Sequence, residues 1–325
     1  MVEIAFCFPW KWEEEVEAVE RMWKQFGGSR EVYFHREVLC RSWEGREQWV
    51  LTISSQHLRL EKEKESYEVN DGQPGVSTCS KFEARKPVIL LSSRVHPGET
   101  PASHALNGVL KLLLDTKSEA SKILLRNFVF KIVPSLNPDG VFHGHFRKDR
   151  LLQNLNRFYK RPDPKKQPGP YNLRGLMDYF SENHRLVFYC DFHAHSGIRN
   201  CFLYGNHCNF VRQVEARLFS KILGQLSEGF SYQDCDFSAY QMKQKEKTEE
   251  VGKEGCARVM GYYQALLAHS YTLEMTYHSI IDPSTKQEIK PLELTDLEDV
   301  GKQLCHALIY QFGLNRYLTK ATEVP

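Results

Sequence analysis

The chain has 325 residues, with 43 Lys and Arg against 41 Asp and Glu and a formal net charge of +2. This length is enough to bury a sizeable core, so the chain is not expected to be disordered. The balanced charge gives no whole-chain attraction to nucleic acid or a membrane surface, and no stretch reaches the ~18 apolar residues of a membrane span, so neither partner is expected.

Helical patterns and short apolar runs alternate along the chain. Apolar, β-branched runs predict strands at Glu31–Leu39, Gln48–Ser54, Pro87–Ser92, Phe128–Pro134, Arg185–Phe192 and Ser270–Tyr277. Periodic apolar residues predict helices at Lys11–Gln25, Pro101–Asp115, Leu173–Glu182, Val211–Gly224 and Leu294–Phe312. Most strands are apolar on both faces, which requires cover on both. The sequence therefore predicts an α/β fold, with a mixed, mostly buried β-sheet flanked by helices on both faces.

Three segments lack a clear helix or strand pattern. Glu61–Arg85 and the proline-rich Lys160–Pro170 are predicted loops, and the mixed-charge run Gln241–Gly255 is expected to be a solvated surface segment. None of them resembles a linker with a change of composition across it. Residues 1–325 are therefore expected to form a single domain.

The cysteines and the start of the chain bear on the cellular compartment. The nine cysteines are odd in number, scattered singly and without a CxxC pair, which is a poor disulfide framework. The opening MVEIAFCFPWKWEEEVEAVE lacks the basic and apolar regions of a signal peptide. Both features predict a soluble protein of the reducing cytoplasm.

His96 and Glu99 lie three residues apart in SSRVHPGET, between a predicted strand and a predicted helix. A catalytic zinc site takes three protein ligands and keeps one position open for water. The pair would supply two ligands, although this spacing is common by chance. His193 follows another apolar strand in LVFYCDFHAHSG, where α/β enzymes place their sites, and completes a His, Glu, His set.

Between these motifs, FKIVPSLNPDGVFHGHFRKDRLLQNLNRFYK contains an Asn-Pro-Asp-Gly sequence that predicts a turn. Arg147, Asn156 and Arg157 follow it. An arginine fork binds a carboxylate through two hydrogen bonds and can also polarise a carbonyl oxygen. Each arginine alone is more often a surface residue, but beside a metal these residues would form a substrate clamp.

Glu274 interrupts the apolar strand HSYTLEMTY. A carboxylate buried among such neighbours is costly unless it has a partner or a role. Beside a metal, Glu274 could take a proton from water and pass it to a leaving amine. Together with the His, Glu, His set, this predicts metal-assisted peptide hydrolysis.

These motifs resemble the M14 zinc carboxypeptidases, and among them the cytosolic carboxypeptidases that trim polyglutamate from tubulin. The resembling stretches follow in family order: AFCFPW (5–10), SSRVHPGETPAS (92–103), LNPDGVFHGHFR (136–147), NLNR (154–157), DFHAHSG (191–197) and HSYTLE (269–274). The segment YFHREVLC, followed by WVLTISS, is most similar to the cytosolic carboxypeptidase 5 branch. The resemblance implies that His96, Glu99 and His193 bind one Zn²⁺ per chain, with Glu274 as the proton acceptor.

The resemblance also implies how substrate is held. Arg147 would stabilise the oxyanion, and Asn156 and Arg157 would bind the terminal carboxylate of the substrate. The family tyrosine that covers the bound C-terminus is expected at Tyr262 or Tyr263, and the spacing to Glu274 does not decide between them.

An acidic substrate side chain needs a cation in its pocket, and Arg258 and Lys253 are the candidates. Two departures from the family pattern stand out. Asn154 replaces an Asp that orients the first zinc histidine in many secreted carboxypeptidases, and a neutral amide raises histidine basicity less. The N-terminal β-sandwich domain of the cytosolic relatives is expected to be absent, leaving a catalytic domain with its motifs at 92–277.

The expected function is removal of C-terminal or branch-point glutamates from polyglutamylated proteins such as tubulin. The expected partners are glutamylated tubulin tails or other acidic polypeptide C-termini. The protein is expected in the cytoplasm, in association with microtubules or cilia. One alternative is an M14-like amidohydrolase that acts on another acyl substrate. Asn156 and Arg157 argue against it, because they favour a substrate with a peptide C-terminus. The other is a catalytically idle tubulin-binding homologue, which would not need Glu274.

Overall fold

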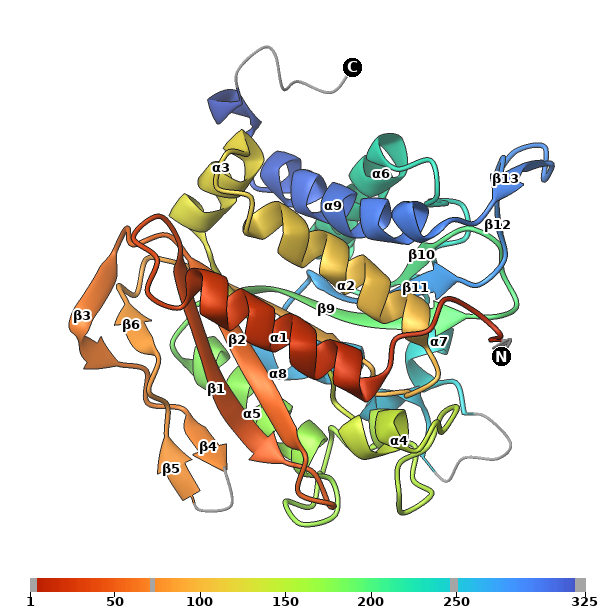
Figure 1. The fold of residues 1–325 in the computed structure, drawn as a ribbon. Helices are drawn as coiled ribbons and strands as arrows, with labels where there is room; N and C mark the ends of the chain where they lie inside the picture. The colour runs from red at the N-terminus through yellow and green to blue at the C-terminus, as the bar shows by residue number, and fades with distance from the viewer. Residues whose placement is uncertain (1–4, 71–73, 246–250, 319–325) are drawn as a thin grey trace, which may run out of the picture.

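The computed structural model describes residues 5–70, 74–245 and 251–318, which are built around a nine-stranded mixed β-sheet (Figure 1). The strand order is β10-β11-β9-β7-β8-β2-β1-β4-β5. The strands are β1 Tyr33–Arg41, β2 Glu47–Ser54, β4 Glu68–Asn70, β5 Pro74–Val76, β7 Val88–Ser93, β8 Val129–Val133, β9 Leu186–His195, β10 Phe202–Tyr204 and β11 Ser270–Thr276. In the centre, β8, β7, β9 and β11 run parallel to one another.

Helices cover both faces of this sheet (Figure 1). One face packs against α1 Trp12–Phe26, α2 Thr100–Leu113, α3 Glu119–Asn127, α6 Phe210–Leu226 and α9 Leu294–Gln311. The other packs against α5 Pro168–Glu182 and α8 Ala257–Ala265. Side chains alternate between the two cores, so that Ile89 and Leu91 of β7 face the first and Val88 and Leu90 the second. This arrangement confirms the predicted α/β fold.

The strands and helices predicted from the sequence are all present, with ends that differ by a few residues. The largest difference is in α5, which begins at Pro168 rather than Leu173 and so takes up the end of the predicted loop Lys160–Pro170. Proline is tolerated in the first turn of a helix, because the N–H that it lacks has no partner there.

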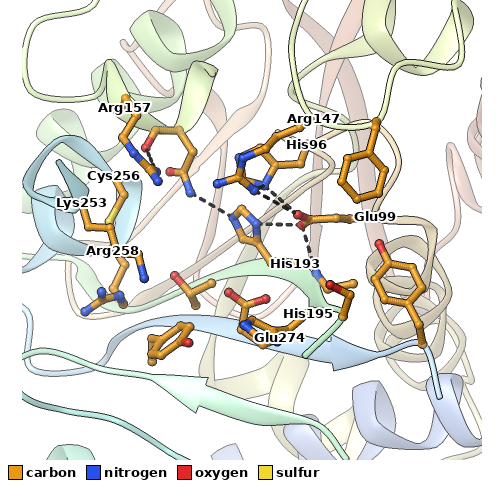
Figure 2. Close-up of a pocket in the computed structure, with 17 residues that line it drawn as sticks. His96, Glu99, Arg147, Arg157, His193, His195, Lys253, Cys256, Arg258 and Glu274 are labelled. Atoms are coloured by element: carbon orange, nitrogen blue, oxygen red, sulfur yellow. Dashed lines mark hydrogen bonds and ion pairs between the residues drawn. The ribbon is translucent and has the colours of Figure 1, made fainter. Parts of the chain in front are cut away.

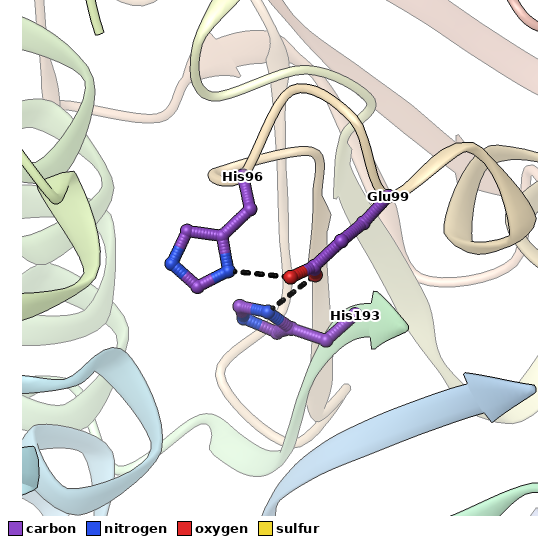
Figure 3. A group of neighbouring side chains, drawn as sticks. All are labelled: His96, Glu99 and His193. Carbon is purple, nitrogen blue, oxygen red and sulfur yellow. Dashed lines mark hydrogen bonds and ion pairs between the residues drawn. The ribbon is translucent and has the colours of Figure 1, made fainter. Parts of the chain in front are cut away.

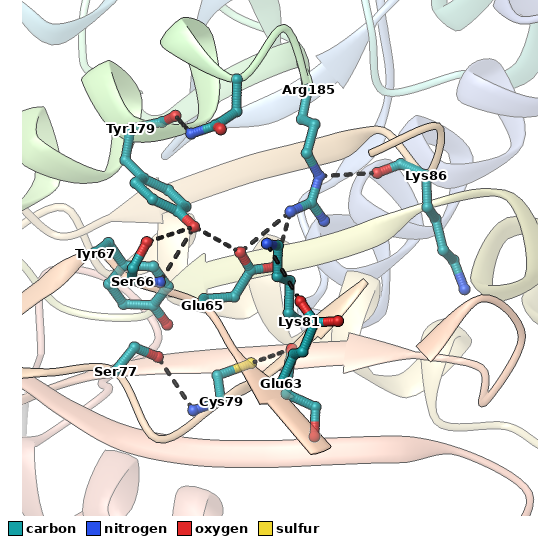
Figure 4. A network of polar contacts seen from close by, with 12 residues as sticks. Glu63, Glu65, Ser66, Tyr67, Ser77, Cys79, Lys81, Lys86, Tyr179 and Arg185 are labelled. Carbon is teal, nitrogen blue, oxygen red and sulfur yellow. Dashed lines mark hydrogen bonds and ion pairs between the residues drawn. The ribbon is translucent and has the colours of Figure 1, made fainter. Parts of the chain in front are cut away.

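Three expectations were wrong. The predicted loop Glu61–Arg85 contains strands: β4 and β5 extend the main sheet, and β3 Arg59–Lys64 pairs with β6 Ser80–Phe82. These strands are short or charged, as in the ion pair of Glu63 on β3 with Lys81 on β6 (Figure 4), and they have no apolar run that would reveal them. The Asn-Pro-Asp-Gly sequence starts a helix, α4 Pro138–Phe142, because the Asn137 side chain accepts a hydrogen bond from Gly140 N.

The third wrong expectation concerns Gln241–Gly255, whose described parts are not a purely solvated segment. They include the end of α7 Ala239–Lys243 and the short helix η2 Lys253–Gly255, with Met242 and Gly255 buried. Residues 246–250 of this run lie outside the described residues. The remaining elements are η1 Leu155–Arg157, η3 Asn315–Tyr317 and the hairpin of β12 Ser279–Ile281 and β13 Glu288–Pro291.

Two further observations concern the whole chain. All nine cysteines lie in the described residues as free thiols, and most of them are buried. Over the described residues, none of the helices combines the length and apolar character that crossing a bilayer requires.

Candidate metal centre and active-site cavity

His96, Glu99 and His193 meet at the C-terminal ends of two neighbouring parallel strands (Figure 3). His96 and Glu99 lie in the loop between β7 and α2, and His193 lies near the end of β9. His96 Nδ1 is 2.8 Å from Glu99 Oε1, and His193 Nδ1 is 2.9 Å from Glu99 Oε2. All three residues are buried, and one ligand atom from each lies within 4.8 Å of the others. Two imidazole nitrogens and a carboxylate are a zinc donor set, so these residues fit the metal.

The outer nitrogen of each histidine faces an oxygen acceptor. His96 Nε2 is 2.9 Å from Asn154 Oδ1, and His193 Nε2 is 2.9 Å from Asp191 Oδ2. Such an acceptor favours a hydrogen on Nε2 and leaves Nδ1 to face Glu99. The structure thus shows the expected contact of Asn154 with the first histidine. It adds Asp191, which the sequence analysis did not assign.

The charges in this group are strongly coupled. Burial opposes the ionisation of Glu99, but the neighbouring His96 and His193 outweigh it and lower the pKa of this carboxyl. Burial likewise opposes charge on His193, yet Asp191 and Glu99 raise its pKa well above the ordinary range. Burial lowers the pKa of His96. The site therefore holds negative charge that a divalent cation would neutralise.

Glu274 faces the same space from the neighbouring strand β11. It pairs with His193 in the parallel register, so both side chains rise from the same face of the sheet. Burial raises the pKa of the Glu274 carboxyl to about 7, against the opposing effect of His193. Arg147 approaches from the other side, with Nη1 3.8 Å from Glu99 Oε1 (Figure 2). A proton acceptor and a cation thus flank the candidate metal centre.

These groups line a cavity of about 330 Å³ (Figure 2). Asn156, Arg157 and Arg258 line it as well, so the structure brings together most of the residues that the sequence analysis singled out. Asn156 lies in η1, where its Oδ1 accepts a hydrogen bond from Ala257 N at 3.2 Å. Arg157 is buried, and its Nη1 donates to Asn156 O at 3.0 Å.

Arg258 and Lys253 give one side of the cavity a positive charge. Arg258 is buried, and its Nη1 donates to Gly205 O and, at 3.0 Å, to Asn206 Oδ1. Lys253 Nζ donates to Gln241 Oε1 at 2.7 Å and to Gln244 Oε1 at 3.0 Å. Burial lowers the pKa of both groups. Both cations are therefore held in place before any ligand binds.

The structure does not bring Tyr262 and Tyr263 into the cavity. Tyr262 packs against a small cluster that includes Met242 and Val259, and Tyr263 is 53% exposed. The tyrosines that line the cavity are Tyr204 of β10 and Tyr277, which directly follows β11. The assignment of a tyrosine that covers the bound C-terminus therefore stays a prediction.

Arg94 supports the loop that carries the first two candidate ligands. It is buried, it has a positive φ of 55°, and its Nε donates to Pro97 O at 2.9 Å. Its Nη1 donates to Ser103 Oγ at 2.8 Å and to Trp10 O at 3.3 Å. One guanidinium thus ties the middle of the loop to α2 and to the N-terminal segment. A sequence signal existed, since Arg94 stands two residues before His96 in an otherwise uncharged strand end.

Comparisons with known proteins identify the class to which this fold and site belong. Residues 19–291 match the family model described as zinc carboxypeptidase, peptidase M14. The chain therefore belongs to the zinc carboxypeptidase family. This confirms the resemblance that the motifs indicated.

Named relatives are cytosolic carboxypeptidases. The chain is 29% identical to cytosolic carboxypeptidase-like protein 5 of Homo sapiens, over 85% of its own length and 42% of that protein. It is 32% identical to cytosolic carboxypeptidase 1 of Xenopus laevis, over 86% of its own length and 22% of that protein. The chain thus spans less than half the length of these curated relatives.

Solved structures share the fold. A metallo-carboxypeptidase from Burkholderia cenocepacia matches with a TM-score of 0.71 and 19% identity, over 95% of this chain and 71% of that one. A metallo-carboxypeptidase from Pseudomonas aeruginosa, in complex with (2-guanidinoethylmercapto)succinic acid, matches with a TM-score of 0.68 and 18% identity. The match covers 96% of this chain and 71% of that one.

Proposed function

We propose that this protein is a zinc-dependent metallocarboxypeptidase that removes C-terminal or branch-point glutamates from polyglutamylated proteins. The observation that carries the proposal is the register pairing of Glu274 with His193, which places a half-buried carboxyl beside the His96, Glu99, His193 group. A catalytic zinc site needs three protein ligands and an open position, and hydrolysis also needs a nearby base. Both parts lie on the wall of one cavity.

The proposed roles follow from these positions. Zinc, one per chain and held by His96, Glu99 and His193, would polarise the scissile carbonyl and make water more acidic. Glu274 accepts a proton from the attacking water and returns it to the leaving nitrogen, and burial, which raises its pKa above the ordinary carboxyl value, suits both steps. Arg147 donates hydrogen bonds to the carbonyl oxygen as negative charge develops there.

The other cavity residues hold the end of the substrate. Arg157, with Asn156, binds the terminal carboxylate, because a guanidinium fork matches the geometry of a carboxylate. Arg258 and Lys253 attract an acidic side chain, and a partly buried cation does so more strongly than one in bulk water. This charge distribution supports a glutamate as the residue that is released (Figure 2).

The proposed partners are glutamylated tubulin tails or other acidic polypeptide C-termini, in the cytoplasm and along microtubules or cilia. The names of the cytosolic carboxypeptidase relatives support the compartment. An acidic, flexible tail also matches the cationic side of the cavity. The two alternatives share the fold. An amidohydrolase on another acyl substrate would cleave a different substrate, and an idle tubulin-binding homologue would show no turnover.

The test is mass spectrometry of branched and linear glutamylated tubulin peptides incubated with wild type and with Glu274→Gln. We expect wild type to release glutamate and the variant to lose at least ~100-fold in rate, the usual contribution of a positioned acid or base. Both proteins should contain one zinc per chain. Zinc-loaded wild type that cleaves no acidic peptide would refute the substrate, and turnover by Glu274→Gln would refute the base.

A matched variant tests the acidic specificity. Arg258→Met keeps an unbranched, largely apolar stem, shorter than that of arginine, and removes the charge. We expect it to lower kcat/KM for peptides that end in glutamate and to leave cleavage of alanine-terminated peptides nearly unchanged. An equal loss on both peptide types would show that Arg258 supports the cavity wall rather than selecting the side chain.

A further inference from the structure

The two histidines of the candidate metal centre have chemically different partners. His96 Nε2 faces the neutral amide oxygen of Asn154, whereas His193 Nε2 faces the carboxylate of Asp191, each at 2.9 Å. Asp191 is 0% exposed. A carboxylate behind a metal-ligating imidazole fixes the ring and raises its basicity, and a neutral amide raises it less. The two imidazoles are therefore unequal electron donors.

Asp191 is placed behind the ligands rather than among them. His193 presents Nδ1 to Glu99 and Nε2 to Asp191, so the two carboxylates lie at different edges of the ring. Another group near Nε2 is the amide nitrogen of Asn156, at 3.3 Å. That nitrogen is itself a donor, because Asn156 Oδ1 accepts from Ala257 N. Asp191 is thus the partner that accepts the Nε2 hydrogen.

A buried chain of hydrogen bonds holds Asp191 in place. Ser92 Oγ donates to Asp191 Oδ1 at 2.7 Å, and Tyr189 OH lies 2.7 Å from Ser92 Oγ. Because Ser92 gives its hydrogen to Asp191, Tyr189 must donate to Ser92. Ser92 and Asp191 are also paired in the register of β7 and β9. Both oxygens of the Asp191 carboxylate therefore have hydrogen-bond donors, Ser92 and His193, and both donors lie on central strands of the sheet.

We propose that Asp191 is a positioning residue that makes His193 the stronger of the two histidine donors and so sets the zinc affinity of the site. The inference rests on the proposed metal centre. The alternation of side chains along a strand explains this contact, because Asp191 and His193 are two residues apart on β9 and point to the same face. A carboxylate at position 191 thus reaches the outer edge of the ring on position 193.

The test compares Asp191→Asn, Asn154→Asp and the double variant by zinc competition with a chromophoric chelator of known affinity. Asp191→Asn keeps the shape and one oxygen acceptor but removes the charge. We expect it to bind zinc ~10–100-fold more weakly, the usual effect of losing such a partner. Asn154→Asp in the Asp191→Asn background should recover much of this loss, because it places a carboxylate behind the other histidine.

Controls separate this role from a structural one. The metal-free forms of wild type and Asp191→Asn should have the same circular dichroism spectrum, and Ser92→Ala should show a smaller affinity loss of the same sign. An unchanged zinc affinity in Asp191→Asn would overturn the proposal, and so would a loss that Asn154→Asp fails to reduce. If wild type itself takes up no zinc, the proposed function fails. If wild type binds one zinc and Asp191→Asn binds it equally well, only the role of Asp191 fails.

Discussion

Glu274 sits in the interior of a buried strand, and its environment has a consequence for the pH dependence of catalysis. Burial raises its pKa to about 7, and a general base must be ionised to act. Activity should therefore be lost as pH falls through the pKa of Glu274. A bound zinc ion adds positive charge nearby and lowers that pKa, so the acid limb of kcat/KM should lie below pH 7 but above the ordinary carboxyl range. The pH dependence of kcat/KM on a glutamate-terminated peptide measures the position of this acid limb.

His195 is the matched control for that profile. It also lines the cavity, and burial lowers its pKa below the ordinary histidine value. His195→Asn removes this titration and leaves Glu274 in place. The acid limb should persist in the variant, and its disappearance would assign the limb to His195.

The residues of the candidate site differ in how far the sequence could predict them. His96 and Glu99 share one short loop, so their proximity follows from local spacing. Glu274 was recognisable because a carboxylate inside an apolar strand is rare. Tyr204 was not assigned, because its position depends on which strands are neighbours. Asp191 was not assigned either, although its two-residue spacing from His193 on one strand was a signal for it. Tyr204 pairs with Thr272 of β11, which is itself paired with Asp191 of β9.

Helices α2 and α9 pack so closely that glycine is required at their contact. A Cβ at Gly301 would lie 1.8 Å from Ala105 O, and one at Gly108 would lie 1.9 Å from Glu298 O. Both clashes are with backbone, which cannot move aside alone. Because α2 follows directly from the loop that carries His96 and Glu99, this contact also supports the site.

Gly301→Ala should therefore destabilise the fold, by at least the ~1–3 kcal/mol that overpacking usually costs. The control is Gly175→Ala in α5, where an added Cβ meets nothing within 4 Å. That variant should gain about 0.5–1 kcal/mol, because alanine favours a helix over glycine. Urea unfolding measures both. Equal effects of the two substitutions would contradict the close α2–α9 contact.

The candidate metal centre joins parts of the chain that are distant in sequence. Its ligands come from the loop after β7 and from β9, and His96 also contacts Asn154 beside η1. A ligand that binds only the folded state stabilises it by mass action, by about 4 kcal/mol at a free concentration of 1,000 times Kd. Removing zinc with a chelator should therefore lower Tm, and adding zinc back should restore it.

His96→Ala is the control for the zinc-dependent change of Tm. With a proposed ligand removed, its Tm should respond little to chelator or to added zinc. A full zinc-dependent shift in this variant would place the stabilising metal elsewhere on the molecule.

The sequence by itself determined the α/β class and the central strands, and it predicted His96 and Glu99 side by side in one loop. These features depend on local signals: apolar runs, helix periodicity and short spacings within one loop. The tertiary structure alone decided that Tyr204 and Tyr277 line the cavity. It also decided that Glu274 of β11 lies beside His193 of β9. Such pairings depend on strand order and register, which bring distant residues together and leave no local pattern.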